Sequence, residues 1–188
     1  MAIKTSIPRV VSEELPANPF AFEVFALASK QRSKAQKVEV LRKYEHPSLK
    51  SLCIWNFDES VISLLPQGLV PYSSVGQQNV SSGNLSDNIN RAVQMMGELD
   101  SNSIGSQDQG HTSIRKEYTY FYNFIKGGND GLSQRKRETM FINILEGLHP
   151  LEAEILILVK DKKLEEKYKI TKDIVAQAYS DIQWGGRS

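Results

Sequence analysis

The stretch that most constrains the fold is residues 133–179, where apolar residues recur at the spacing of amphipathic helices. Apolar residues from Met140 to Leu148 follow an i, i+1, i+4, i+5, i+8 pattern, which places them on one helix face. Pro150 suits the first turn of a second helix, where its missing N–H costs nothing. Thr171 is a good N-cap for a third. We therefore predict three short helices joined by basic turns.

The first half of the chain carries a second helical pattern. Asn18 and Pro19 predict the start of a helix, because they suit the N-cap and the first helical position. The basic, apolar-poor stretch 30–34 separates two apolar sets, so we predict two helices with Ser33 capping the second. A short and very apolar helix over residues 48–55 follows a proline turn.

Other segments lack a continuous helical pattern. Residues 1–17 predict an N-terminal arm, and the proline-punctuated run 64–72 predicts an ordered loop on the core. Residues 73–112 are rich in Ser, Asn, Gln and Gly, which is typical of a flexible insertion. One short amphipathic helix, Leu85–Leu99, is predicted within it, either as a satellite helix packed on the domain, which we favour, or as a docking helix for a partner. The predicted organisation is one domain whose helical halves, 18–72 and 113–188, flank this insertion.

Two aromatic segments follow the insertion. Aromatic and basic residues together in the run 114–126 could stack on nucleic-acid bases, but helical spacing predicts that Phe121 and Phe124 point into the core. In the tail, we expect Trp184 to pack on the body and Arg187 to remain free. The turn Lys160–Lys163 is expected to be too polar to bury.

Charge is segregated along the chain. The 188 residues carry a formal net charge of only +1, yet Lys and Arg concentrate in residues 30–50, 135–137 and 160–172. This excludes a histone-like polycation and leaves room for a local anion-binding face. Solvated helix surfaces explain the same pattern, and charge alone favours that interpretation.

Cysteine content and hydropathy bound the compartment. The single cysteine, Cys53, lies in an apolar run, which excludes a disulfide framework and fits a reducing compartment. The first residues lack the continuous apolar segment of a signal peptide, and no run approaches the length of a membrane span. We therefore expect a cytosolic protein without membrane contact.

No sequence pattern predicts a catalytic or metal site. The glycine-rich run 126–131 lacks both a preceding strand and the Lys-Ser/Thr pair of a phosphate-binding loop. His46, His111 and His149 are far apart and have no Cys or carboxylate at ligand spacing. No Gly-x-Ser-x-Gly motif is present. We expect a protein that is not an enzyme and uses no metal, cofactor or small-molecule substrate.

The order of elements carries the positive signal. The chain contains, in order, FEVFALASKQRSKAQKVEVLRKY, a turn, a short helix ending in IWNFDESV, a variable middle, RKRETMFINILEGLHPLEAEILILVKDKKL and ITKDIVAQAY. This order resembles the N-terminal DNA-binding domain of ATP-dependent DNA ligases. The residues that match its pattern are Ser33, Lys34, Lys37, Val40, Leu41, Arg137, Ile144, Leu145, Ala153, Ile157, Lys162, Lys163, Leu164, Val175 and Ala178.

In that family the scaffold is all helical and grips the DNA backbone through basic turns. The resemblance therefore implies an all-α fold, a compact multi-helix domain with a flexible insertion, and sequence-independent DNA binding. A ligase also needs a nucleotidyltransferase domain with a Lys-x-Asp-Gly motif, which this sequence does not contain. The expected phosphate contacts are Lys30, Arg32, Lys34, Lys37, Arg135, Lys136, Arg137, Lys160, Lys162 and Lys163.

The whole chain also resembles a family of small, uncharacterised proteins of marine tailed phages of the T-even type. The likeness is clearest in ANPFAFEVFALASKQRSKAQKVEVLRKYEHP and from HPLEAEILILVKDKKL onward. It implies a phage accessory protein in the host cytoplasm during infection, or in the virion. The alternative is an interaction or virion structural protein that docks on a viral or host protein through Leu85–Leu99 or the N-terminal arm. Modulation of a host enzyme such as RNA polymerase is a third hypothesis. The three basic clusters at predicted turns favour DNA binding.

Overall fold

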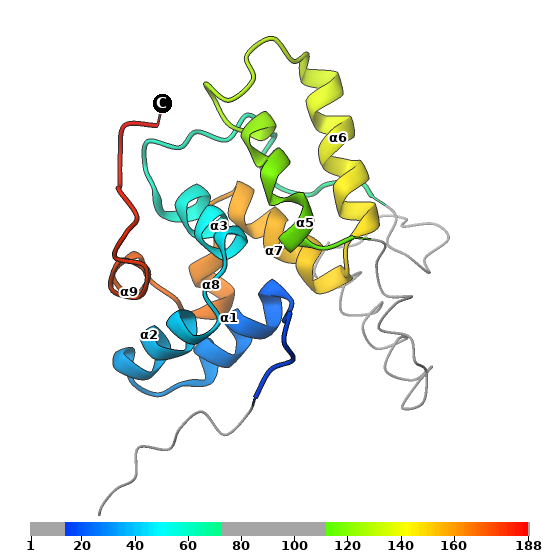
Figure 1. Ribbon diagram of the computed structural model, residues 1–188. Coiled ribbons are helices and arrows are strands. Elements are labelled where there is room, and N and C mark those ends of the chain that lie inside the picture. Colours follow the sequence, from blue (N-terminus) through cyan, green and yellow to red (C-terminus); the bar gives the residue numbers. More distant parts are fainter. Residues whose placement is uncertain (1–13, 73–111, 188) are drawn as a thin grey trace, which may run out of the picture.

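The computed structural model describes residues 14–72 and 112–187 (Figure 1). Within these ranges the only β pairing is one bridge between Ser63 and Ile125. The all-α fold class is therefore confirmed. The predicted helix Leu85–Leu99 and most of the predicted arm lie outside the described residues. The helices are α1 (Ala21–Lys30), α2 (Lys34–Lys43), α3 (Pro47–Phe57), α5 (Ile114–Glu117), the 3₁₀ helix η2 (Tyr118–Phe124), α6 (Gln134–Gly147), α7 (Pro150–Lys160), α8 (Leu164–Tyr168) and α9 (Lys172–Ala178).

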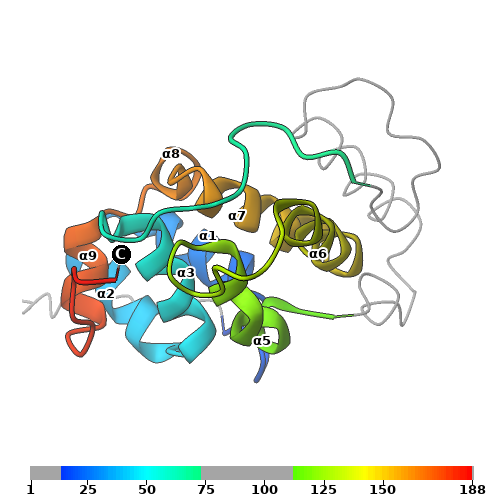
Figure 2. The same cartoon turned by 90° about the horizontal axis from the view of Figure 1, so that it is seen from above.

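Helix α7 is the centre of the fold and contacts α1, α3, α6 and α8 (Figures 1 and 2). Its sequence is apolar around most of its circumference, as expected for a helix surrounded by neighbours. Pro150 begins it, and the His149 Nδ1 atom accepts the amide N–H of Leu151 at 3.1 Å. Ile155 and Leu156 are fully buried, and each contributes about 1.5–3 kcal/mol relative to an exposed side chain.

The predicted caps at Ser33 and Thr171 are confirmed. The Ser33 hydroxyl accepts the amide N–H of Gln36 at 3.2 Å, and the Gln36 side chain accepts the amide N–H of Ser33 at 3.3 Å. This reciprocal pair is a capping box. The Thr171 hydroxyl accepts the amide N–H of Ile174 at 3.4 Å and starts α9. The break between α1 and α2 therefore lies where the polar side chain of Ser33 can replace missing helical hydrogen bonds.

Two parts of the helix prediction are wrong. Helix α1 begins at Ala21 rather than at Pro19, because the Glu23 carboxylate accepts the amide N–H of Phe20 at 3.1 Å and makes Phe20 the cap position. A short helix, α8, follows the charged turn at the end of α7, where the sequence pattern predicts no helix. Lys169 ends α8 in the left-handed conformation, with φ of 50°.

The aromatic run folds as α5 followed by η2. A 3₁₀ helix repeats every three residues, so Phe121 and Phe124 share its inward face. Both are buried, which confirms that part of the prediction. Tyr120 and Tyr122 remain 50% and 49% exposed. The same short helix therefore supplies core residues on one side and aromatic surface on the other.

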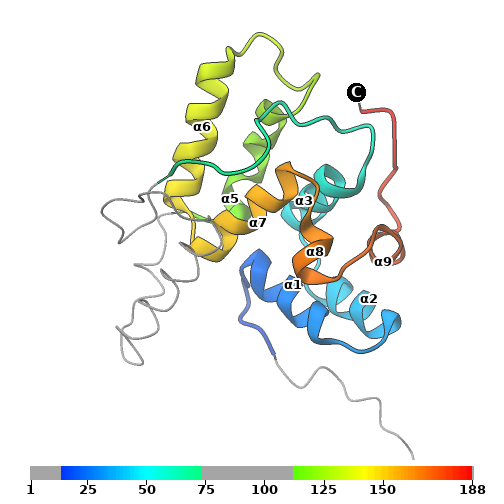
Figure 3. The same cartoon turned by 180° about the vertical axis from the view of Figure 1, so that it is seen from behind.

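Helix α2 packs against α1 on one side and against α9, the last helix of the described part, on the other (Figure 3). The α1–α2 turn therefore lies close to the start of α9. The start of α6 lies at the other end of the molecule (Figures 1 and 2). This arrangement decides which of the predicted basic clusters meet.

Candidate functional site

Cations of α2 hold this helix against α9. Lys34 forms a surface ion pair with Asp173, and the two side chains are 53% and 59% exposed. The Lys37 Nζ atom donates to the main-chain carbonyl of Lys169 at 2.9 Å. Arg42 donates to the carbonyl of Gln177 at 2.6 Å. The cations at the start of α2 therefore lie beside Lys169, which precedes α9, and Lys172, which begins it.

The α7–α8 turn brings further lysines toward the same region. The Lys162 Nζ atom donates to the main-chain carbonyl of Asp58 at 2.7 Å, while Lys163 is exposed. Burial lowers the pKa of Lys162, and the positive charge of Lys172 lowers it further, against the opposing effect of Asp58 and Glu59. Lys162 and Lys172 are therefore close enough to repel each other.

Two of the three predicted clusters therefore lie around the start of α9. We call this surface the basic band and define it as Lys30, Arg32, Lys34, Lys37, Lys162, Lys163, Lys169 and Lys172. Arg135 and Lys136 are exposed, but they belong to the start of α6 and lie apart from the band (Figures 1 and 2).

The prediction that Arg137 contacts phosphate disagrees with its surroundings. Its side chain is buried, with 5% exposure, under the segment that leads into α6. Its guanidinium donates to the carbonyls of Asn123 at 2.8 Å, Asn129 at 3.1 Å and Leu132 at 3.2 Å, and to the Gln134 side chain at 2.8 Å. These bonds satisfy backbone acceptors that would otherwise lack partners. Arg137 is therefore a structural cation.

Lys160 needs the same correction, and the expectation that its turn is too polar to bury is wrong at this position. Lys160 is 2% exposed. Its ammonium donates to the carbonyls of Pro66 at 2.8 Å and Gly68 at 3.0 Å, and pairs with Asp161 at 2.7 Å. Asp161 in turn accepts the amide N–H of Gly68 at 3.0 Å. The pair fastens the predicted 64–72 loop to the end of α7.

Lys169 and Lys172 belong to the basic band but were absent from the predicted contacts. Lys169 reaches it because α8 ends there in a left-handed turn, and Lys172 because it opens α9. The Lys172 Nζ atom also lies 5.1 Å from the centre of the Trp184 ring, so the tail packs as predicted. The signal for both lysines was the high lysine content of residues 160–172.

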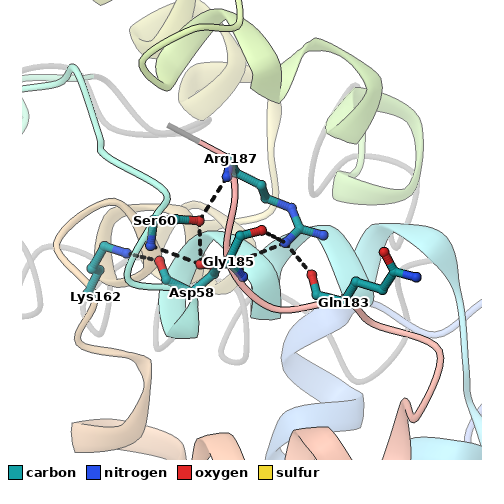
Figure 4. A network of polar contacts seen from close by, with 6 residues as sticks. All are labelled: Asp58, Ser60, Lys162, Gln183, Gly185 and Arg187. Carbon is teal, nitrogen blue, oxygen red and sulfur yellow. Dashed lines mark hydrogen bonds and ion pairs between the residues drawn. The ribbon is translucent and has the colours of Figure 1, made fainter.

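The C-terminal tail is anchored beside the band by Asp58 (Figure 4). The Asp58 carboxylate accepts the amide N–H of Gly185 at 3.0 Å and pairs with the Arg187 guanidinium at 2.6 Å. The expectation that Arg187 is free is therefore wrong. Burial alone would raise the pKa of Asp58, but hydrogen bonds from Ser60, Gly185 and Arg187 outweigh it and lower the pKa to about 2. Asp58 therefore stays ionised and keeps Arg187 in place.

Glu152 is the most deeply buried carboxylate of the described part, with 0% exposure. Its two oxygens accept the amide N–H groups of Ala21 and Ile114, each at 3.1 Å, at the starts of α1 and α5. Burial raises the pKa of Glu152 to about 7, although these hydrogen bonds oppose the shift. Because both oxygens are used by helix starts, the group acts as a structural cap.

Other reactive groups have structural surroundings. Cys53 is fully buried, and burial raises the pKa of its thiol far above the usual range. Among the described residues, no three or more His, Cys, Asp or Glu side chains gather as a metal-binding set would require. The described helices also include none with the length and apolar content needed to cross a membrane.

Comparison with known proteins provides a family relationship. Neither the curated proteins nor the solved structures include a significant match to this chain. The sequence does match the family described as "Family of unknown function (DUF6433)" over residues 24–96 and 98–166. These ranges span most of the chain and most of the helices described above. The chain therefore belongs to this family, DUF6433.

Proposed function

We propose that this protein is a non-catalytic accessory protein that binds the DNA backbone largely independently of sequence, with the basic band as the contact surface. The observation that supports the proposal is that Lys34, Lys37, Lys162, Lys169 and Lys172 meet around the start of α9, in a chain whose net charge is only +1. The other three cations of the band, Lys30, Arg32 and Lys163, are exposed residues close to them in the sequence. A local positive surface attracts phosphate even when the whole molecule is nearly neutral.

The contacts that these cations already make leave capacity for phosphate. A lysine ammonium has three donors, so Lys37 and Lys162 each keep donors beyond the single carbonyl that they contact. The Lys34–Asp173 pair is more than half exposed on both sides, so solvent screens it and exchanging Asp173 for a phosphate costs little. Arg32 and Lys163 are exposed and form no side-chain hydrogen bond or ion pair with any described residue.

Phosphate contacts supply affinity and carry no direct information about base sequence. The band consists of long, flexible cations on turns and helix starts, which suits that kind of contact. From the phage resemblance, we propose that the protein acts in the host cytoplasm during infection. The alternative, if DNA binding fails, is docking on a viral or host protein through the N-terminal arm or through Leu85–Leu99, which lies outside the described residues.

The test is a salt series of duplex DNA binding, measured by fluorescence anisotropy with the full chain. The double variant Arg32→Ala/Lys163→Ala removes two exposed cations of the band. The matched control, Arg135→Ala/Lys136→Ala, removes two exposed cations at the start of α6. We expect the band variant to bind more weakly at every salt concentration and to lose about two units of slope in log K against log salt, while the control keeps the wild-type slope.

Two outcomes would contradict the proposal. One is the absence of salt-sensitive binding at low ionic strength. The other is an equal loss in both double variants, which would indicate a general charge effect without a defined contact surface.

A further inference from the structure

A small aromatic hollow lies between α3 and η2, on the side of the molecule where the tail is anchored. Its volume is about 230 Å³. This is below the range of about 300–1,000 Å³ typical of pockets for whole drug-sized ligands. A hollow of this size suits a single planar ring. It is lined by Ser51, Ile54, Trp55, Val61, Tyr118, Thr119, Phe121, Tyr122, Ile125 and Arg187.

The geometry of η2 explains why the ring of Tyr122 stays partly exposed at this hollow. The inward positions Phe121 and Phe124 pack against Trp55, with ring centroids 5.6 and 6.1 Å away, and of these three rings Phe121 and Trp55 line the hollow. Tyr122 lines the hollow and is 49% exposed. Tyr120 has the same exposure, at 50%, but does not line the hollow. Only one of the two exposed tyrosines can therefore contact a ligand inside it.

Arg187 is the charged residue of the hollow, and Asp58 and the carbonyl of Gln183 hold its guanidinium (Figure 4). Because Asp58 balances its charge, Arg187 offers the hollow a planar face and fixed donors more than a net charge. Guanidinium planes and aromatic rings are the surfaces on which proteins stack unpaired bases. Both kinds of group line the hollow.

Hydrogen bonds connect the hollow to the basic band. Arg187 pairs with the Asp58 carboxylate, and the carbonyl of the same Asp58 accepts Lys162 of the band (Figure 4). Val61 lines this hollow and also a second one of about 270 Å³, which Lys162 and Glu59 line. A single strand that places one base beside Tyr122 thus has Lys162 of the basic band nearby for a phosphate, with Glu59 as an opposing charge.

We propose that this hollow receives an unpaired base of single-stranded DNA while the basic band holds neighbouring phosphates. This inference rests on the proposed function and deepens it, because it names single-stranded DNA as the preferred form. Aromatic stacking beside a positive surface is the common basis of single-strand binding without sequence preference. A paired base inside a duplex cannot enter a hollow of this kind without leaving its stack.

The experiment measures the anisotropy of a labelled thymidine oligonucleotide and of a duplex of the same length with the full chain. We expect the single strand to bind more tightly than the duplex at equal salt. Tyr122→Ala should lower single-strand affinity about tenfold and leave duplex affinity unchanged. Tyr122→Phe should retain binding, because it keeps the ring. Tyr120→Ala is the matched control and should bind as the wild type does.

The outcomes separate this inference from the proposed function. Salt-sensitive duplex binding without a single-strand preference, or equal single-strand affinity of Tyr122→Ala and Tyr120→Ala, would overturn the inference alone. A protein partner in the hollow would produce that second result. Absence of binding to either DNA form would overturn both. Far-ultraviolet circular dichroism and the thermal midpoint of each variant are the controls for the fold. We expect both to stay at wild-type values, because the substituted tyrosines are half exposed.

Discussion

The start of α6 and the start of α2 both carry basic runs, but one cation of the α6 run is buried while those of the α2 run stay at the surface. At α6, Arg137 is enclosed and donates to three main-chain carbonyls and one side chain. At α2, Lys34 and Lys37 make contacts at the surface. A buried cation surrounded by carbonyls cannot be lent to a partner without leaving those carbonyls unsatisfied, whereas an exposed pair exchanges partners readily. The difference teaches that access to the charge, more than its position in a basic run, decides which residues can bind DNA.

The strongest test of this comparison is Arg137→Met. We expect the free energy of unfolding to fall by about 4 kcal/mol, because buried carbonyls lose charged donors. Urea denaturation followed by circular dichroism measures the change. Lys136→Met, the exposed neighbour, should change stability by less than about 0.5 kcal/mol. Equal effects of the two substitutions would show that burial does not separate them.

Two buried titratable groups, Glu152 and His149, should make the free energy of unfolding depend on pH in opposite directions. The pKa of Glu152 in the folded protein is about 7, above its ordinary 4.5, so the folded state holds this proton more tightly than the unfolded state. Its contribution to the free energy of unfolding is therefore lost as pH rises from about 4.5 to about 7, by about 3 kcal/mol in total.

His149 acts in the opposite direction. Burial lowers its pKa from 6.5 to about 4, so its contribution is present above pH 6.5 and is lost as pH falls toward 4. In the wild type, the contributions of Glu152 and His149 to the slope of the free energy of unfolding against pH therefore oppose each other. In Glu152→Gln the opposing slope is absent, and His46, whose pKa is also lowered by burial and by Arg115, acts in the same direction as His149. We therefore expect stability to rise between about pH 4 and pH 6.5, in addition to a constant loss. Urea midpoints across this pH range measure it, and an unchanged profile would contradict the assignment.

Lys160→Met tests the second buried cation, at the end of α7. We expect a loss of about 2 kcal/mol, because the carbonyls of Pro66 and Gly68 lose their donor while the edge of the loop stays near water. Hydrogen exchange should show faster opening of residues 64–72. Lys163→Met, which removes an exposed lysine from the same turn, is the control. Equally fast hydrogen exchange of residues 64–72 in both variants would show that burial does not separate the two lysines.

Lys34→Ala should have the smallest effect on stability. Its ion pair with Asp173 lies at the surface and is screened by solvent, so we expect no resolvable change in the urea midpoint. Its effect should appear in DNA binding, as a lower affinity with a salt slope reduced by about one. A clear loss of stability would place Lys34 with the structural cations.

Local signals were sufficient to predict most helices. Ser33 and Thr171 are capping residues whose effect depends on only the next few amides, and both were found from the sequence. The apolar face of α6 was found in the same way, because a helical repeat is visible without knowledge of the partner. The start of α1 was misplaced because Glu23 caps the chain at Phe20, which competes with the good cap residue Asn18.

The accessible part of the candidate surface could not be predicted from composition. Arg137 is buried only because the segment from Asn123 to Leu132 folds over it, and Lys160 only because the 64–72 loop returns to α7. Both contacts join residues whose approach depends on the complete fold. Helix α8 was missed for a related reason, since five residues carry too little periodicity to identify a helix.

The reach of Glu152 has a consequence for the order of events during synthesis. Its carboxylate caps α1 from 131 positions further along the chain, and α5 from 38 positions. When α1 and α5 leave the ribosome, this cap has not yet been made, and the central helix α7, which carries Glu152, is still missing. We expect the amino-terminal helices to wait in a partly ordered state until α7 emerges, so that native packing begins late in translation and then involves distant parts of the chain together.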